Sequence, residues 1–334
     1  MSEAHGGDIW TRLVEVARWA PSPHNTQPWR VRPRSATGAD LYMERARMLP
    51  DEDTTGRFLE CAMGIFIEAL SIAAAAEGLS LTAENVELDT EAALVHVARL
   101  GLREGAPKEP LNAALLLRRR TSRLPHDGAP VEERVLAAVR DEVAAGGGQA
   151  LTWTDDAGLI GEVLDRNVAA VFHDLNVGPY RREIASWFRY TRGQAERTRD
   201  GLDARCMRMP GYEMYLSTVF PASMRWGVTK PLMRALYHAR LGGAKQLGFL
   251  SGPFFAGREE AQAAGRCLLR VWLTLAAEDV SIHPFGNLVT NGAAHSWLTG
   301  RLGVERVWLV FRFGRTPVPP RSLRLAAGEV LCGR

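Results

Sequence analysis

Hydrophobic positions along the chain follow two kinds of pattern. Two long stretches, residues 57–77 and 259–277, are apolar on most faces and predict two buried helices. Shorter stretches in which apolar and polar residues alternate predict strands at 29–33, 40–44, 92–99 and 305–313, the first two as a hairpin. A round of helix, loop, hairpin, buried helix and strand is followed by a second such round with insertions. This order predicts an α+β fold, in which long helices lie on mainly antiparallel sheets.

The remaining sequence predicts further regular elements and one irregular segment. Helical spacing and glycine-bounded apolar runs predict helices at 8–20, 111–120, 132–143 and 156–184, and strands at 150–154 and within 247–257. Residues 191–243 hold many methionines and aromatic residues without clean periodicity. We interpret this segment as an inserted lid or arm.

Composition and charge exclude several classes of function. The chain has 334 residues, and its 41 Lys and Arg nearly balance 38 Asp and Glu, so bulk charge gives no argument for a nucleic-acid partner. It has no glycine-rich dinucleotide fingerprint, and His238, His283 and His295 lack the spacing of metal ligands. Four widely spaced cysteines, no signal-peptide pattern and no long uncharged apolar run predict a cytoplasmic protein without a membrane span.

The first candidate for chemistry is the loop at residues 20–29, which has the sequence APSPHNTQPW. Its prolines restrict the backbone. Ser22, Asn25 and Gln27 can then point at the polar edge of a flat heterocycle, because amides both donate and accept hydrogen bonds. The alternative is a capping turn, in which Ser22 and Asn25 satisfy local backbone groups.

The second candidate is the basic run RRRTSR at residues 118–123. Guanidinium groups present a planar fork to phosphate oxygens, and neighbouring hydroxyls add donors. The run therefore predicts a phosphate site. The alternative is a solvated basic end of a helix, stabilised by the helix dipole.

Both segments resemble motifs of the nitroreductase superfamily. The loop is similar to the Pro-Ser, Asn and Gln-Pro-Trp signature that lines the FMN site in that family, which implies flavin contacts for Ser22, Asn25 and Gln27. His24 resembles the variant found in the fused, Acg-like branch.

The basic run resembles the family's Arg-x-Ser-x-Arg segment, which grips the FMN phosphate. This implies phosphate-side roles for Arg119, Thr121 and Arg123, with Arg120 between them. In the family this segment precedes the Pro-Ser loop, whereas here it follows about 100 residues later. A fusion of two halves, each of which keeps one part of the site, predicts that order.

Two further segments resemble parts of the family's site. The stretch HPFGN at 283–287 is similar to the loop beside the reactive edge of the flavin, which implies contacts from Pro284, Gly286 and Asn287 and a backbone N–H facing N5. Arg321, with Arg315 behind it, resembles a terminal basic residue that reaches the phosphate. The alternatives are an ordinary turn and a solvated tail arginine.

The resemblance implies a single-chain pseudo-dimer, monomeric or homodimeric, with nitroreductase-like halves at 1–105 and 106–334 and FMN between them. It implies an FMN-dependent oxidoreductase that acts on a small molecule by a ping-pong cycle: a nitro, quinone or enone-like acceptor, or a small metabolite that is oxidised. NAD(P)H is the candidate electron donor, and no catalytic acid or base is identified. One alternative is a flavin-sequestering protein whose arm covers the flavin without turnover. Another is docking on membrane lipid through Trp226, Met233 and neighbouring basic residues.

Overall fold

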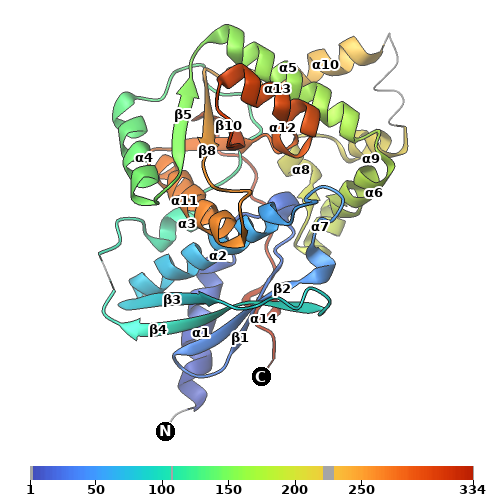
Figure 1. Ribbon diagram of the computed structural model, residues 1–334. Coiled ribbons are helices and arrows are strands. Elements are labelled where there is room, and N and C mark those ends of the chain that lie inside the picture. Colours follow the sequence, from blue (N-terminus) through green and yellow to red (C-terminus); the bar gives the residue numbers. More distant parts are fainter. Residues whose placement is uncertain (1–2, 107, 221–228, 334) are drawn as a thin grey trace.

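The computed structural model describes residues 3–106, 108–220 and 229–333, and it has a four-stranded antiparallel sheet on either side of two central helices (Figure 1). The first sheet contains β1 (Trp29–Pro33), β2 (Gly38–Glu44), β3 (Leu79–Asn85) and β4 (Leu94–Glu104). The second contains β5 (Ala150–Thr154), β8 (Gln246–Ser251), β9 (Val280–Pro284) and β10 (Val307–Arg315). Their spatial orders are β1-β2-β4-β3 and β5-β8-β10-β9. The α+β prediction is confirmed, and one strand order occurs twice.

The two central helices, α2 (Arg57–Ala76) and α11 (Arg258–Ala277), are the two buried helices that the apolar stretches predict. They cross between the sheets (Figure 1). A Cβ atom on Gly64 would lie 2.0 Å from the carbonyl oxygen of Gln262, and one on Gly265 would lie 2.0 Å from that of Cys61. Glycine at both positions therefore lets the two backbones approach this closely. By length and composition α2 could also cross a membrane, but 83% of its most apolar window is buried inside this fold.

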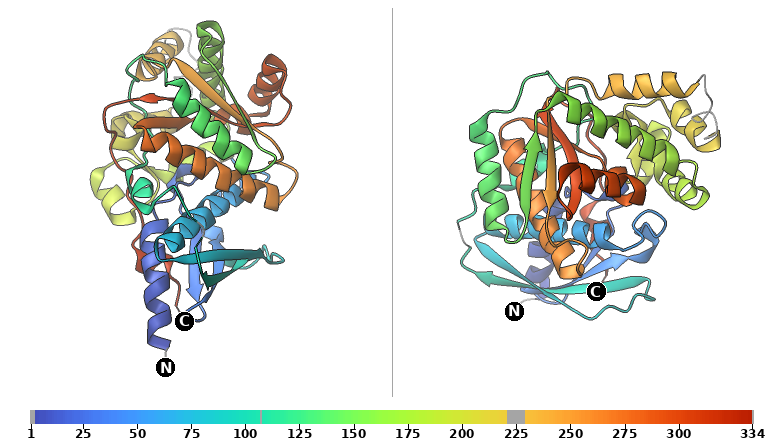
Figure 2. Two further views of the ribbon diagram at one scale, coloured as in Figure 1. Left: turned by 90° about the vertical axis from the view of Figure 1, so that its left-hand side faces the viewer. Right: turned by 45° about the horizontal axis from the view of Figure 1, so that its top comes forward.

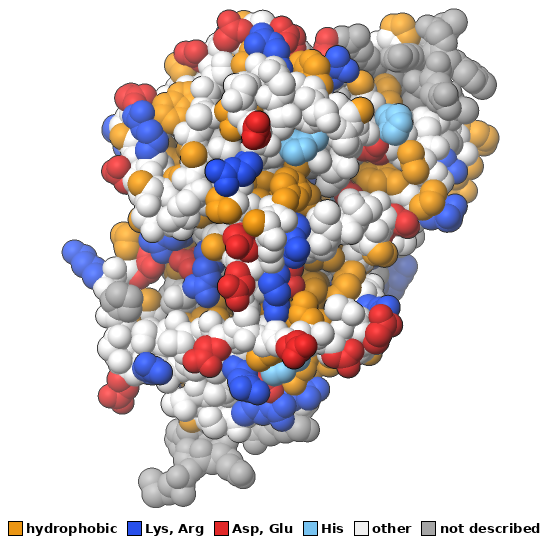
Figure 3. All heavy atoms as spheres, in the orientation of Figure 1, with side chains coloured by type: hydrophobic (Ala, Val, Ile, Leu, Met, Phe, Trp, Pro, Cys, Tyr) orange, Lys and Arg blue, Asp and Glu red, His pale blue; other side chains and the backbone are white. Residues whose placement is uncertain are grey.

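Both halves of the chain contribute to one hydrophobic core. Its main cluster takes Trp29 from the first sheet, Phe66 from α2, Leu269 from α11 and Phe311 from the second sheet. The second sheet also contributes to a smaller, separate cluster, which includes Phe249 of β8. On the face shown in Figure 3, acidic and basic side chains lie close together across the middle of the molecule.

The region 156–184 is largely helical, as predicted, but the structure divides it into two helices. These are α5 (Ala157–Asp174) and α6 (Gly178–Trp187). Pro179 has no backbone N–H and fits only the first turn of a helix, so a new helix begins there. The sequence analysis also missed β3, β9 and the helix α13 (Gly292–Leu302). The alternating apolar and polar residues of β3 were a usable signal that was overlooked.

The segment interpreted as an arm is mainly helical. It contains α7 (Arg192–Thr198), α8 (Ala204–Met207), α9 (Gly211–Val219) and α10 (Thr229–Arg240), and its short strand β7 (Leu202–Asp203) pairs with β6 (Phe188–Arg189). Thr191 caps α7 by accepting a hydrogen bond from the Gln194 N–H. Trp226 lies outside the described residues, as does the side chain of Met233.

The tail of the chain returns to the first sheet, so both termini lie at the same end of the molecule (Figure 1 and Figure 2). Helix α14 (Ala327–Val330) packs against α1 (Glu3–Ala17), and Leu331 forms a parallel bridge with Val31 of β1. Along the chain, α3 (Ala113–Arg118) and α4 (Glu133–Ala145) connect the last strand of the first sheet, β4, to the first strand of the second sheet, β5. The end of α1, the end of α3 and the tail meet, because Arg119 contacts Trp19 and Arg321 contacts Leu117.

Candidate functional site

The loop after α1 has a backbone conformation that is rare for residues other than glycine. It contains a 3₁₀ turn, Pro23–Asn25, and the φ angles of His24, Asn25 and Gln27 are 47°, 57° and 51°. Left-handed conformations cost roughly 1 kcal/mol or more per residue and persist only where neighbouring contacts enforce them. Ser22 Oγ accepts a hydrogen bond from the Gln27 N–H at 2.9 Å, so it satisfies a backbone group of its own loop. Its flavin contact stays a prediction.

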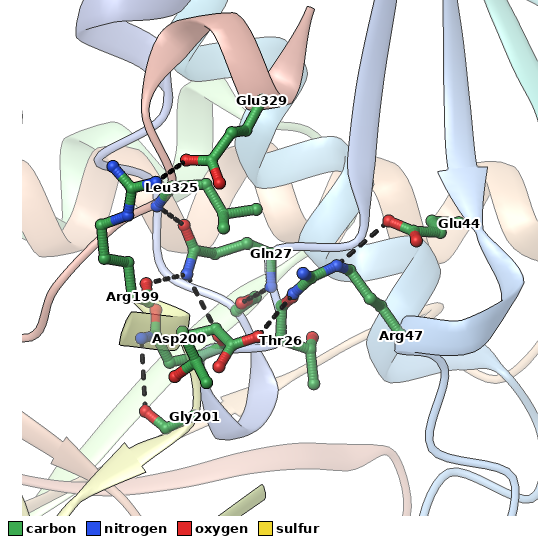
Figure 4. A network of polar contacts seen from close by, with 12 residues as sticks. Thr26, Gln27, Glu44, Arg47, Arg199, Asp200, Gly201, Leu325 and Glu329 are labelled. Carbon is green, nitrogen blue, oxygen red and sulfur yellow. Dashed lines mark hydrogen bonds and ion pairs between the residues drawn. The ribbon is translucent and has the colours of Figure 1, made fainter. Parts of the chain in front are cut away.

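Gln27 binds both the arm and the tail (Figure 4). Its Nε2 donates to the carbonyl of Arg199 at 3.0 Å, and its Oε1 accepts from the N–H of Leu325 at 2.8 Å. The side chain is fully buried. These bonds fix the position of the loop, and a direct contact of Gln27 with a flavin ring stays a prediction.

Asn25 bridges the same two segments. Its Nδ2 donates to the carbonyls of Gly201 at 3.3 Å and Leu323 at 3.1 Å. Its Oδ1, and Oγ1 of the neighbouring Thr26, are buried without a partner among the described residues. A buried acceptor without a donor is costly, so the Asn25 side chain keeps an open hydrogen-bonding position that a ligand donor can fill.

Arg119 of the basic run points inward and is almost unpaired. Its guanidinium lies over the ring of Trp272 at 4.4 Å, and its one hydrogen bond to a described residue is a long contact of 3.4 Å from Nη2 to the carbonyl of Trp19. Nε and Nη1 are buried without a partner among the described residues. Burial, and then the charges of Arg324 and Arg321, lower the pKa of Arg119 well below its ordinary value. An anion at this position would compensate a buried charge.

Two tail arginines complete this cationic cluster. Arg321, which the resemblance singled out, stacks on Trp19 at 3.7 Å. Arg324 is buried, donates from Nε to the carbonyl of Ala20, and has a pKa lowered to about 10, mainly by burial. The sequence analysis missed Arg324, because a lone arginine in a polar tail gives no signal of burial. Arg119, Arg321 and Arg324 are called the arginine cluster below.

The other residues of the basic run have different surroundings. Arg120 Nη1 donates to the carbonyl of Pro319 at 2.7 Å, and Thr121 forms a bridge with Ile282 at the edge of β9. Arg123 donates to the carbonyl of Cys206 at 3.4 Å and lies close to His283. Arg119 and Arg123 therefore share no hydrogen-bond partner among the described residues, and the phosphate role of Arg123 and Thr121 stays a prediction.

The loop at 283–287 leads from β9 into the short helix α12 (Asn287–Thr290). Pro284 pairs with Phe311, and Asn287 Nδ2 donates to Asp174 and to Tyr180, each at 2.9 Å. The N–H groups of Gly286 and Asn287 donate to no other described residue. Free N–H groups at this turn are what a contact with the edge of a flavin requires, and that contact stays a prediction.

A chain of polar contacts joins the two loops. His24 pairs with Glu52, and the carboxylate of Glu183 accepts from the N–H groups of Asp51 at 2.8 Å and Glu52 at 2.9 Å. Glu183 lies on α6, as does Tyr180, the partner of Asn287. Burial opposes a charge on His24, but the carboxylates of Glu52 and Glu183 together outweigh burial, and the pKa of His24 is raised. The 3₁₀ turn at residues 23–25 is thereby tied to α6 and through it to α12.

Two surface hollows lie near this region. One, of about 300 Å³, is lined by the turn after β2, which includes Arg47, by the end of α6 and β6, which includes Arg189, and by Asp200 of the arm. The other, of about 620 Å³, lies between the same turn and the start of β4. Neither is lined by the arginine cluster or by residues 283–287.

Similarity to known proteins covers part of the sequence and nearly all of the fold. No protein-family model matches the chain. A Mycobacterium tuberculosis protein with the provisional name NAD(P)H nitroreductase Acg is 30% identical over 141 residues, which span 41% of this chain and 42% of that protein. The match thus spans less than half the length of that relative.

Two solved structures extend the comparison. The crystal structure of a protein provisionally described as a nitroreductase, from Anabaena variabilis, superposes with a TM-score of 0.53 over 95% of this chain and 90% of that chain, at 11% identity. The FMN-dependent nitroreductase NfnB of Mycobacterium smegmatis, solved with NADPH, has a TM-score of 0.35 at 18% identity over 62% of this chain and 92% of that chain, which is too distant to support an argument. The chain thus shares its fold with the Anabaena variabilis protein over nearly its whole length, and its sequence is similar to that of the M. tuberculosis relative over less than half of either chain.

Proposed function

We propose that the chain binds FMN and is an FMN-dependent oxidoreductase that acts on a small organic molecule. The observation that supports this most is Arg119, a buried guanidinium with two unpaired donors beside the signature loop. The arginine cluster would hold the FMN phosphate, since charge-assisted hydrogen bonds to phosphate compensate buried cations. Bound FMN would supply the redox chemistry, while the protein supplies position and electrostatics.

The other candidate residues would orient the ring. Asn25 offers its free Oδ1 to a ring N–H, and the free N–H groups of Gly286 and Asn287 would face the ring edge, where donors stabilise charge that develops on reduction. The signature loop lies in residues 1–105 and the other segments in 106–334. We propose that these are the two fused halves, because each holds one copy of the repeated sheet.

The electron donor in this proposal is NAD(P)H, which agrees with the name of the M. tuberculosis relative. The acceptor is a nitro, quinone or enone-like compound, reduced in a ping-pong cycle. An absorbance spectrum of the purified chain, taken before and after anaerobic addition of NADPH, tests both parts. Flavin bands that bleach support the proposal, and absence of flavin bands even after incubation with FMN refutes it.

A specific observation favours a second function, sequestration of flavin without turnover. Helix α8 of the arm lies between the candidate segments, because Cys206 Sγ contacts the carbonyl of Pro320 at 3.7 Å and its own carbonyl accepts from Arg123. An arm that stays there with FMN bound would keep NADPH away from the ring. This alternative is supported if the flavin bands persist after addition of NADPH but bleach after addition of a chemical reductant.

A further inference from the structure

A segment of three consecutive arm residues, 199–201, is hydrogen-bonded to the backbone and the side-chain amides of the signature loop. The Gly201 N–H donates to the carbonyl of Asn25 at 3.2 Å, and Asn25 Nδ2 donates back to the carbonyl of Gly201 at 3.3 Å. Gln27 Nε2 donates to the carbonyl of Arg199 at 3.0 Å. Residues 199–201 are called the brace below. The brace contacts the loop at two of its three left-handed residues.

Asp200, at the centre of the brace, anchors it to Arg47 in the turn after β2 (Figure 4) and to Arg189 of β6. Its carboxylate accepts from Arg47 at 2.9 Å and from Arg189 at 2.6 Å, and it is only 7% exposed. Arg47 also donates to the carbonyl of Thr26 at 2.9 Å, inside the signature loop. Asp200 therefore holds the arginine that holds the loop, and its loss would leave two nearly buried guanidiniums without their shared anion.

The brace itself has a conformation that few sequences can adopt. Arg199 and Gly201 have φ angles of 52° and 74°. A Cβ on Gly201 would lie 2.4 Å from the carbonyl oxygen of Trp187, so a larger residue would displace the brace from the loop. Two of the three left-handed loop residues, Asn25 and Gln27, are thus bonded to a brace whose own backbone is left-handed at Arg199 and Gly201, and each conformation supports the other.

We propose that Asp200 is a positioning residue for the cofactor: through Arg47 and the brace it fixes the left-handed conformation of the loop, and so couples docking of the arm to binding of FMN. The inference rests on the proposed FMN function. It assigns the arm a role beneath the cofactor loop, distinct from a lid over the flavin. Because coupling is reciprocal, FMN must strengthen docking of the brace by the same factor by which the brace strengthens binding of FMN.

The first experiment is FMN titration of the full chain with Asp200→Asn and Gly201→Ala. Both should weaken FMN binding by roughly tenfold or more, and should change the visible circular dichroism of the bound flavin. Asp200→Glu keeps the charge and should recover part of the affinity. The matched control is Gly193→Ala in α7, where a Cβ meets only Arg197 Nη1 at 3.6 Å, and it should bind FMN as the unmodified chain does.

Hydrogen exchange on the unmodified chain gives a readout that does not depend on the folding of any variant. FMN should slow exchange at the Gly201 N–H, while amides of the second sheet far from the site keep their rates. If the unmodified chain binds FMN but exchange at Gly201 is unaffected, or if Asp200→Asn and Gly201→Ala bind FMN with unchanged affinity and spectrum, the coupling is refuted. If the unmodified chain itself binds no FMN, the proposed function fails and this inference fails with it.

Discussion

Gly64 and Gly265 are each the eighth residue of a 20-residue helix, and each lies against the carbonyl of the fifth residue of the other helix, Gln262 or Cys61. The crossing of α2 and α11 is therefore symmetric at the level of single residues. Together with the repeated strand order, this symmetry is what two copies of one ancestral unit would produce.

Alanine at either glycine of the crossing should destabilise the protein. Each new Cβ would lie 2.0 Å from a backbone oxygen, so the helices must separate, which costs about 1–3 kcal/mol or more. Urea unfolding of Gly64→Ala and Gly265→Ala measures this loss. Gly161→Ala in α5 is the control, because the new Cβ would enter open space. Alanine is also a better helix former than glycine, so this variant should lose no stability. Equal stability of all three variants would contradict the close crossing.

Methionine at Arg119 should have opposite effects on stability and on binding. Removal of a buried charge with no paired anion should stabilise the unliganded chain by about 1 kcal/mol or more, because burial penalises the guanidinium. The same change should weaken FMN binding by roughly tenfold or more, since charge-assisted hydrogen bonds to the phosphate are lost. Urea unfolding without FMN and FMN titration provide the two measurements.

The control for this variant is Arg118→Met, which removes an exposed arginine from the same run, one whose partner is Asp279 at 2.5 Å. It should leave FMN affinity unchanged. Loss of affinity in both variants to the same degree would mean that overall positive charge, and not the position of Arg119, attracts the anion.

The pair of His24 and Glu52 should make stability depend on pH near neutrality. The folded pKa of His24 is raised above its ordinary value of about 6.5, so the stabilisation is complete below that pH and is lost as the pH rises through the folded value. His24→Asn should abolish this slope, because asparagine tolerates the φ of 47° but does not titrate. Unfolding free energies of the unmodified chain and of His24→Asn, measured from about pH 6 upward, test this prediction. Parallel pH profiles for the two proteins would refute the role of His24. Glu183 and Arg123 also act on His24, in opposite directions.

Leucine at Gln27 should weaken both the fold and FMN binding. It leaves the Leu325 N–H and the Arg199 carbonyl without their partner, and each buried group left unsatisfied costs about 1–3 kcal/mol. Gln262→Leu is the control: that side chain is also buried, but it binds Glu60 at the helix crossing, away from the loop. Both variants should unfold at lower urea, and only Gln27→Leu should lose FMN affinity. Equal FMN affinity in the two would place Gln27 outside the cofactor site.

Much of the fold was predictable, because its signals are local. The apolar faces of residues 57–77 and 259–277 predicted two buried helices, and the repeated order of elements predicted two related rounds of α+β structure. Where a local signal was weak, the prediction failed. The break near Pro179 within 156–184 was not predicted, because the apolar spacing continues across it. Strand β9 was missed because its last two residues were assigned to the loop at 283–287.

The site was predictable as a set of segments but not as a set of contacts. The sequence by itself determined that a rigid polar loop and a basic run exist, since prolines and arginines have those properties wherever they stand. Only the tertiary structure decided which of these arginines lose water. Arg119 and Arg324 are buried together because the end of α3 and the returning tail meet beside α1, whereas Arg118, one residue away, stays exposed. Desolvation depends on what packs around a group, and the sequence near Arg119 does not indicate that a tail about 200 residues later will cover it.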